Sequence, residues 1–242
     1  MITTYHRPST LDEALALLSQ PNTVPLGGGT LLSQPTTDPV SVVDLQRLGL
    51  DSLRVNGNEL QIGATCTLQA LLEAAECPEA LQTAIKLEAP INIRNSATVA
   101  GTLVASDGRS TFATALLSLD AKITVVSGQS SVVSVGEYIL THPRGLITAI
   151  TIPTNTKFAF EFVSKTPADK PLICAAVTQW NSGRTRLALG GYGTSPMLAM
   201  DGTEADGLET AARNAYHEAN DEWASAEYRM DVAATLAKRC LE

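Results

Sequence analysis

The sequence predicts an α+β protein that divides near residue 157, and three observations support this. Strand-like apolar runs and helical patterns are mixed over the first part of the chain. From about residue 157, three strand-like runs precede two helical segments, an order that is typical of a separate α+β unit. The 242 residues suffice for one large domain or two ordinary ones, and 44% hydrophobic residues indicate a buried core. We therefore expect domains over residues 1–156 and 157–242.

The first helix is predicted by a capping box, in which Thr10 is followed by Glu13. Apolar residues at helical spacing come next, and Pro21 ends the helix. Residues 24–26 then predict a short strand that leads into a glycine turn, and residues 40–45 predict another strand.

A hairpin is predicted next, because residues 53–55 and 60–62 alternate about Asn56-Gly57-Asn58. The remaining patterns of the first part predict helices over 68–75, from Pro78 onward and over 112–119, and strands over 121–126 and 147–152. In the second part they predict strands over 158–163, 172–180 and 184–189, and helices over 204–219 and 224–240.

The charge balance argues against several classes of partner. With 17 Lys and Arg against 25 Asp and Glu, the net charge is -8, and no basic patch favours nucleic acid. No apolar run approaches the roughly 20 residues that span a bilayer. We expect a cytoplasmic protein without a transmembrane segment.

Familiar metal and nucleophile patterns are missing from the sequence. The four cysteines form no C-x-x-C pair, so we expect buried thiols rather than a zinc or iron–sulfur site. The three histidines have no regular partner spacing, which argues against a Ser-His-Asp system. There is no Walker sequence and no G-x-G-x-x-G, and we interpret residues 190–193 as a turn.

Two small-residue turns remain as candidates for chemistry. The first is Gly27-Gly28-Gly29-Thr30, and the second lies within residues 93–103 around Thr98, Ala100, Gly101 and Thr102. Consecutive N–H groups in such turns can form a nest for an anion, and neither turn carries a lysine. A diphosphate held by backbone dipoles and hydroxyls is one interpretation. The alternative is that both are tight turns required for packing.

At these residues the chain resembles a known family, the FAD-binding medium subunit of the molybdenum hydroxylases, which includes carbon monoxide dehydrogenase and the xanthine dehydrogenase group. Residues 27–32 match the family's A-G-G-T-D-L loop, and residues 93–103 match its I-R-N-x-A-T-I-G-G-N-L. Residues 116–121 match L-L-A-L-D-A, and residues 224–229 match A-S-A-E-Y-R. The resemblance spans almost the whole chain.

The resemblance implies a fold and a role. The fold is a vanillyl-alcohol-oxidase-like (PCMH-type) FAD-binding domain with lobes of about 1–52 and 53–156, followed by a C-terminal domain of antiparallel sheet and helices. The role is electron transfer through FAD. A molybdopterin-binding large subunit would oxidise the substrate, a small subunit with [2Fe-2S] clusters would pass the electrons on, and NAD or a quinone would accept them.

The resemblance also implies a set of cofactor-binding residues and no catalytic or metal-binding residue. The set is Leu26, Gly27, Gly28, Gly29, Thr30, Leu31, Asn95, Thr98, Ala100, Gly101, Thr102, Ser106, Thr111, Leu146 and Lys165.

Four members of this set depart from the family pattern. Ala100 and Thr102 replace the first glycine and the asparagine of G-G-N, Thr111 replaces an aspartate, and Leu31 replaces a polar residue. A methyl group at Ala100 would crowd a diphosphate if that position needs a positive φ. These changes keep open one alternative, a flavin-free structural or assembly subunit. A stand-alone flavin reductase is a third possibility, on which the sequence does not bear.

Overall fold

The chain folds into two units in the computed structural model, which describes residues 1–34, 38–167 and 169–242. Unit 1 comprises Met1–Ala74, Ile91–Ala105 and Lys122–Thr151, and unit 2 comprises Ala75–Pro90, Ser106–Ala121 and Ile152–Glu242. This division differs from the expected one near residue 157. Two segments of the expected first domain group with the C-terminal sheet, because their helices pack on it.

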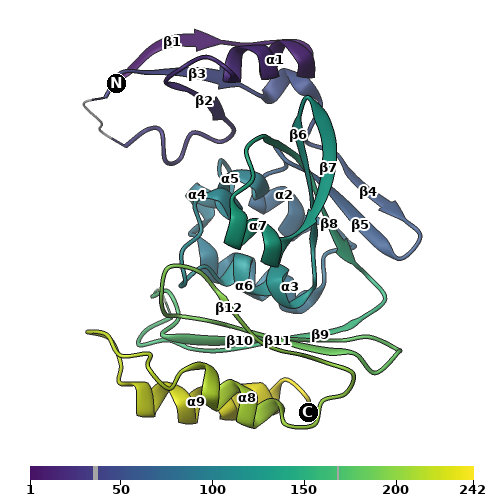
Figure 1. Ribbon diagram of the computed structural model, residues 1–242, viewed down its shortest axis with the longest axis vertical. Coiled ribbons are helices and arrows are strands. Elements are labelled where there is room, and N and C mark those ends of the chain that lie inside the picture. The colour runs from purple at the N-terminus through teal and green to yellow at the C-terminus, as the bar shows by residue number, and fades with distance from the viewer. Residues whose placement is uncertain (35–37, 168) are drawn as a thin grey trace. The chain divides into compact units, whose positions relative to one another are not determined.

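Unit 1 begins with a small parallel sheet (Figure 1). Its strands β1 (Ile2–His6), β2 (Thr23–Leu26) and β3 (Val40–Asp44) lie in the order β1-β3-β2, and α1 (Leu11–Leu18) connects the first two. The capping prediction is confirmed at Thr10, whose hydroxyl accepts the Glu13 N–H at 3.3 Å. The Glu13 carboxylate instead accepts from the Ser9 N–H. The short 3-10 helix η1 (Gln46–Leu48) follows β3.

The larger sheet of unit 1 has the order β4-β5-β8-β6-β7. The predicted hairpin is confirmed, with β4 (Leu53–Asn56) and β5 (Glu59–Gly63) joined at Gly57, whose φ is 60°. The other strands are β6 (Lys122–Ser127), β7 (Gln129–Ser134) and β8 (Leu146–Pro153). The other helices of this unit are α2 (Leu68–Glu73), α4 (Ile91–Arg94), α5 (Val99–Val104) and α7 (Val135–Thr141).

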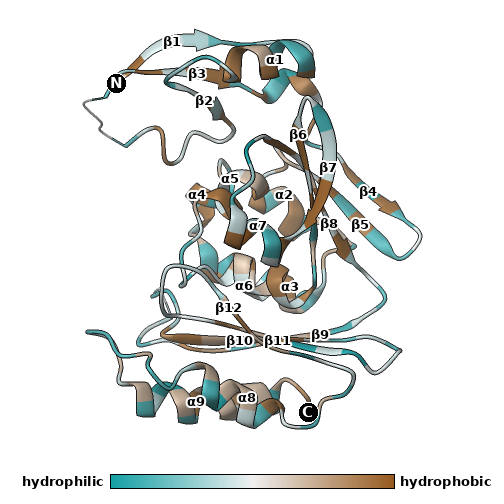
Figure 2. Ribbon diagram, in the orientation of Figure 1, coloured by the Kyte–Doolittle hydropathy of each residue, from teal (hydrophilic) through white to brown (hydrophobic). Residues whose placement is uncertain are grey.

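Unit 2 is an antiparallel sheet with helices on both faces (Figure 1). The sheet has the order β12-β11-β10-β9, from β9 (Lys157–Val163), β10 (Ile173–Gln179), β11 (Thr185–Gly190) and β12 (Met197–Gly202). Alternate residues of β10 point to opposite faces. Ala175 and Val177 pack with α8 (Leu208–Ala215) and α9 (Ala226–Arg239), in which hydrophobic and hydrophilic residues alternate (Figure 2).

The opposite face carries α3 (Glu79–Glu88) and α6 (Thr111–Ser118). All eight residues of α6 are buried, so its hydroxyl groups need partners inside the protein. Ser118 bonds Thr178 of β10 at 2.8 Å, and Thr111 donates to the Ala84 carbonyl of α3 at 2.7 Å. Polar contacts therefore complement the apolar packing in joining α6 to its neighbours.

The residues of the A-S-A-E-Y-R sequence have structural roles at the start of the last helix. Ser225 caps α9 by accepting the Tyr228 N–H, and the Arg229 side chain is fully buried. Its guanidinium donates to both carboxylate oxygens of Asp221 at 2.9 Å and to the carbonyls of Ala219 and Ala224 at 2.8 Å. This arginine thereby closes the loop that precedes α9.

The four cysteines are buried and unbonded to one another, as predicted. Burial raises the pKa of Cys66 to about 11 and that of Cys77 to about 12, so both stay protonated at neutral pH. Over the part of the chain that the structure describes, no cluster of three potential metal ligands occurs and no helix could cross a membrane.

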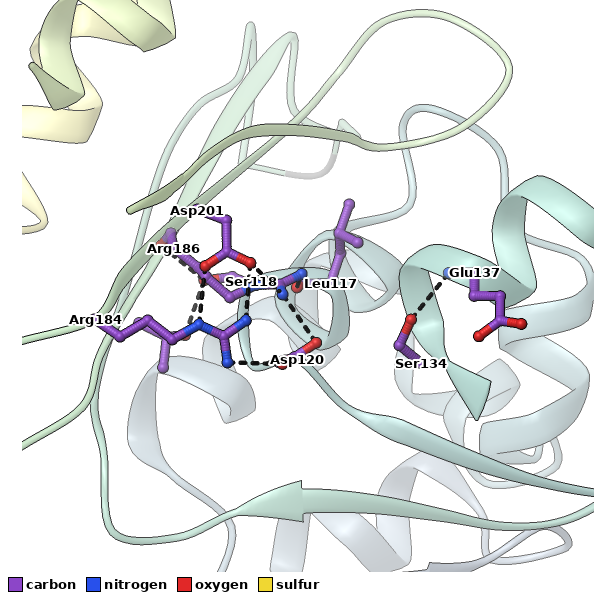
Figure 3. A network of polar contacts seen from close by, with 9 residues as sticks. Leu117, Ser118, Asp120, Ser134, Glu137, Arg184, Arg186 and Asp201 are labelled. Carbon is purple, nitrogen blue, oxygen red and sulfur yellow. Dashed lines mark hydrogen bonds and ion pairs between the residues drawn. The ribbon is translucent and has the colours of Figure 1, made fainter. Parts of the chain in front are cut away.

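Two arginines and two aspartates form an ion network at the edge of unit 2 (Figure 3). Arg184 and Arg186 of β11 each contact both Asp120, which follows α6, and Asp201 of β12, at 2.8 to 2.9 Å. Arg186 also donates to the Leu117 carbonyl at 3.0 Å. The network ties the end of α6 to two strands.

This network predicts an acid-dependent stability. The hydrogen bond from Arg184 lowers the pKa of Asp201. The resulting stabilisation is complete above the unfolded carboxyl pKa of about 3.9 and is lost as the pH falls through the lower folded value. We expect Asp201→Asn to lower the free energy of unfolding by on the order of 1 kcal/mol at pH 7. The difference should vanish in strong acid.

Thermal melts of the parent and variant between acid and neutral pH measure this difference. Asp206→Asn, at an exposed residue of the same unit, serves as the control. A difference that stays constant across the range would contradict the assignment to Asp201.

Candidate functional site

The first glycine turn follows directly from the parallel sheet of unit 1. Strand β2 ends at Leu26 and its neighbour β3 at Asp44, so the carboxyl ends of both strands meet at one edge. Ligands of open parallel sheets bind at this edge. Strand β2 is an edge strand, which explains why Pro25 is tolerated within it. The chain thus delivers Gly27 to the usual place for a ligand.

Two of these glycines are required by a close approach to another segment. A Cβ atom on Gly28 would lie 1.7 Å from the Ser96 carbonyl oxygen, and one on Gly27 would lie 2.7 Å from the Thr98 hydroxyl. Contacts this short would force the neighbouring segment to move, so glycine is favoured at both positions. The two sequence motifs therefore lie against each other in the folded unit.

The first turn presents donors in the manner predicted. Among the residues that the structure describes, none accepts a hydrogen bond from the backbone N–H groups of Gly27, Gly28, Gly29 or Thr30. Gly29 has a φ of +72°, the left-handed conformation that alternates with right-handed residues in anion-binding nests. Four consecutive donors are thus available to a ligand.

The second motif differs from the turn that the sequence predicted, because its residues form the helix α5. Thr98 caps this helix and accepts the Gly101 N–H at 3.2 Å. The Ala100 N–H donates to the Ala64 carbonyl, and the Thr102 N–H donates to the Thr98 carbonyl. The prediction that this motif offers backbone donors to a phosphate is therefore wrong at these positions.

The helix also removes the steric objection to Ala100. This residue is not among the positive-φ positions, and a methyl group is normal in a right-handed helix. The expected crowding does not arise from the backbone conformation. One of the reasons for doubting that FAD binds is thereby removed.

The two motifs line a cavity of about 370 Å³ within unit 1. That volume lies in the range of ordinary ligand sites. No charged side chain lies among the described residues of its lining, which are mostly glycine, small hydroxyl and aliphatic side chains. Backbone dipoles and hydroxyl groups are therefore the polar groups that this cavity offers to a ligand.

The structure brings most of the predicted set together in this cavity. The lining includes Gly27, Gly28, Gly29, Thr30, Leu31, Thr98, Ala100, Gly101 and Leu146. Leu26, Asn95 and Thr102 belong to the same unit but are not part of the lining, and the buried Thr102 hydroxyl has no hydrogen-bond partner.

The other three predicted residues belong to unit 2. Thr111 is fully buried, and its hydroxyl donates to the Ala84 carbonyl and contacts Glu88. Ser106 lies in the segment before α6, and Lys165 lies in the loop after β9. Their proposed contacts with FAD stay predictions.

Sequence reasoning missed several lining residues. Ala64 and Thr65 follow β5, and Gly145 precedes β8. Tyr138 comes from α7, a helix that the sequence analysis did not predict, and burial raises its pKa. Its hydroxyl therefore remains protonated at neutral pH and can donate. The available signal for the first pair was Gly63, a glycine directly after the predicted strand of residues 60–62.

The sequence profile of the FAD binding domain in molybdopterin dehydrogenase matches residues 1–155. The chain belongs to this family. Its cofactor is FAD, and it is an FAD-binding subunit of the oxidoreductases related to carbon monoxide dehydrogenase. The expected family is therefore confirmed.

Curated relatives extend the similarity beyond the matched domain. An uncharacterized protein of Escherichia coli K12, YgfM, is 30% identical over 98% of this chain and 94% of its own length. The medium chain of carbon monoxide dehydrogenase from Afipia carboxidovorans is 26% identical over 98% of this chain and 95% of its own. The similarity to these relatives therefore also covers the C-terminal residues of this chain.

Solved structures confirm the fold. A chain of Cu,Mo-CO dehydrogenase in its cyanide-inactivated form matches with a TM-score of 0.84 and 25% identity, covering 100% of this chain and 96% of that one. A chain of quinoline 2-oxidoreductase from Pseudomonas putida 86 matches with a TM-score of 0.81 at 20% identity, covering 98% and 95%. The predicted fold, an FAD-binding domain followed by antiparallel sheet and helices, is confirmed.

The cavity of unit 1 fits this cofactor. A diphosphate needs several donors. The four N–H groups of residues 27–30, which have no acceptor among the described residues, supply them without a cation. Aromatic rings need apolar walls, and Val104 and Leu146 are among the residues that provide them. The donor set and the walls therefore suit a dinucleotide.

Proposed function

We propose that this chain is the electron-transfer subunit of a molybdenum hydroxylase complex. In this proposal a partner with [2Fe-2S] clusters delivers electrons that a molybdopterin-binding large subunit has taken from the substrate, and an external acceptor receives them. The observation that carries the proposal is the donor loop of residues 27–30, which lies in the part of the chain that matches the FAD-binding family.

The residues of unit 1 have binding and orienting roles in this proposal. The N–H groups of residues 27–30 hold the diphosphate, and Thr98 fixes the opposing segment by capping α5. Ala64 and Cys66 accept the N–H groups of Ala100 and Val99 and so hold α5 against the segment that follows β5. FAD, when bound, supplies the chemistry of accepting and donating electrons.

The absence of an acid–base pair in the cavity agrees with electron transfer. Its described lining includes one titratable side chain, Tyr138, which stays protonated at neutral pH. Proton abstraction from a substrate needs a group that titrates near the working pH. The residues of this cavity thus favour holding a cofactor over transforming a substrate.

Flavin content tests the cofactor assignment directly. We expect the purified chain to be yellow, with an absorbance maximum near about 450 nm and close to one FAD released per chain on denaturation. The measurement combines the absorbance spectrum with chromatography of the released flavin. A colourless chain that takes up no FAD on incubation would contradict the proposal and favour the flavin-free structural subunit.

Co-purification tests the proposed complex. When the tagged chain is isolated from its native host, molybdenum and iron should elute with it at fixed ratios to FAD. A flavin-containing chain that elutes alone and oxidises NADH by itself would instead support a stand-alone flavin reductase.

A further inference from the structure

Unit 2 contains a second cavity, and Lys165, a predicted FAD contact, is the one residue of its described lining that the expected FAD-binding set includes. The cavity measures about 180 Å³ and is lined by Arg109, Lys165, Asp169, Lys170, Leu172 and Trp223. They come from three loops, the one before α6, the one between β9 and β10, and the one before α9. Its volume equals that of about six water molecules, which suits a ligand with a single ring.

The charge of this cavity is opposite to that of the whole chain. Its described lining holds three cations and one carboxylate, whereas the chain carries a net charge of -8. Lys170 pairs with Glu88 at 3.4 Å, and Asp169 accepts a hydrogen bond from Thr166. Within the described chain, neither Arg109 nor Lys165 forms an ion pair. Two positive charges are thus left for a ligand.

Both of these cations lie against the same indole ring. The Arg109 guanidinium carbon lies 4.9 Å from the centroid of Trp223, and the Lys165 ammonium lies 4.8 Å from it. Each contact is favourable, but the two like charges repel each other. An anion between them would relieve this repulsion.

The guanidinium of Arg109 also has an unused donor. One of its terminal nitrogens donates to the Lys170 carbonyl at 3.0 Å, while its Nε–H is buried and has no partner in the described structure. A buried donor without an acceptor is costly. The hydrogen bond to the Lys170 carbonyl holds the guanidinium beside the cavity that it lines.

The loop that carries Trp223 is held in place. Asp221 accepts the N–H groups of Trp223 and Ala224 at 2.9 and 3.0 Å, and the buried Arg229 fixes Asp221 itself. The indole remains 44% exposed. The ring is therefore positioned by the backbone and is accessible to a ligand.

We propose that this cluster binds a small oxyanion, a carboxylate or phosphate, whose apolar body contacts Trp223 and Leu172. Arg109 and Lys165, which have no ion-pair partner in the described chain, provide the charge. The site goes beyond the electron-transfer role and stands on residues of unit 2 alone.

The Trp223 indole N–H resonance tests this site in the full-length chain. The chain has two tryptophans, so Trp180→Phe in a nitrogen-15-labelled sample leaves the signal of Trp223 alone. Benzoate, its uncharged isostere benzamide, and inorganic phosphate are titrated separately, with and without bound FAD. We expect a saturable shift with benzoate or phosphate and none with benzamide. The tighter of the two anions identifies the ligand class.

Two lysine variants with the same change of charge distinguish binding at this site from attraction by the overall charge of the protein. Lys165→Met should weaken anion binding by roughly tenfold, the value of one charged hydrogen bond. Lys157→Met, at an exposed lysine of β9, should leave it unchanged. Equal weakening by both variants, or no saturable shift with either anion, would overturn the inference.

Two further outcomes are also decisive. An equal response to benzamide would overturn the inference, because binding would not depend on charge. If FAD alone shifts the Trp223 resonance and abolishes the response to benzoate, the cluster belongs to the flavin site and the inference fails. Because flavin content is read separately from absorbance, a colourless chain that still binds benzoate contradicts only the proposed function.

Discussion

Replacing Gly28 with alanine is expected to abolish FAD retention. A Cβ atom there would lie 1.7 Å from the Ser96 carbonyl oxygen, so the loop of residues 27–30 must withdraw from the segment that precedes α5. Withdrawal moves its N–H groups away from the diphosphate. Losing even two such bonds, at about 1.5 kcal/mol each, lowers the affinity for FAD by roughly a hundredfold. Equilibrium dialysis and absorbance spectra measure the loss.

A second glycine in the same unit provides the control. Gly57 lies in the β4–β5 turn with φ of +60°, and nothing lies within 4 Å of a Cβ atom added to it. Gly57→Ala should cost about 1 kcal/mol of stability through backbone strain and leave FAD binding intact. Circular dichroism checks that both variants fold. A folded Gly28→Ala variant with a full complement of FAD would refute the assignment of the donor loop.

Replacing Arg229 with methionine should have the largest effect on stability. The fully buried guanidinium satisfies Asp221 and the carbonyls of Ala219 and Ala224, and it lies 5.0 Å from the Tyr192 ring centroid. Removing the guanidinium leaves the carbonyls of Ala219 and Ala224 without this donor, and each such loss costs about 1 to 3 kcal/mol. For a chain of this length that lowers the melting temperature by roughly 10 °C. Differential scanning calorimetry measures the change.

The neighbouring helix α8 offers a matched control. Arg213 pairs with Asp231, but both side chains are about half exposed, at 48% and 62%. Arg213→Met should lower the free energy of unfolding by less than about 1 kcal/mol, as exposed pairs usually do. If the two variants have the same melting temperature, the buried Arg229 does not hold the loop before α9 in place.

Local signals predicted the elements of the chain well where they were strong. Thr10 with Glu13 predicted the start of α1, and Asn56-Gly57-Asn58 predicted the hairpin turn. Both signals work through neighbouring residues, so the sequence carries all of the information they need.

The second motif shows where local reasoning failed. The run from Val99 to Thr102 contains a glycine and small side chains, which suit a turn or a short helix equally. Its helical form depends on the Thr98 cap and on carbonyls some 33 to 36 residues earlier, at Cys66 and Ala64. Such long-range acceptors cannot be recognised from the run itself.

Tyr138 was missed for a related reason. Strand β7 is polar and exposed, and it is defined by pairing with β6 rather than by its own pattern. Helix α7 follows immediately and contains Gly136, which weakens its helical pattern. Strands β1 and β12 were missed as well, since both lie at sheet edges with much of their surface exposed.

The interleaving of the two units has a consequence for how the chain is made. Ribosomes deliver α3 and α6 well before β9–β12, the sheet on which both helices pack. During that interval α6, which is buried along its whole length in the folded unit, lacks its sheet partner, Thr178 included. The apolar residues of α6 therefore lack their sheet partner until the last third of the chain has been synthesised. Unit 2 can form only after that point, whatever the boundary between domains.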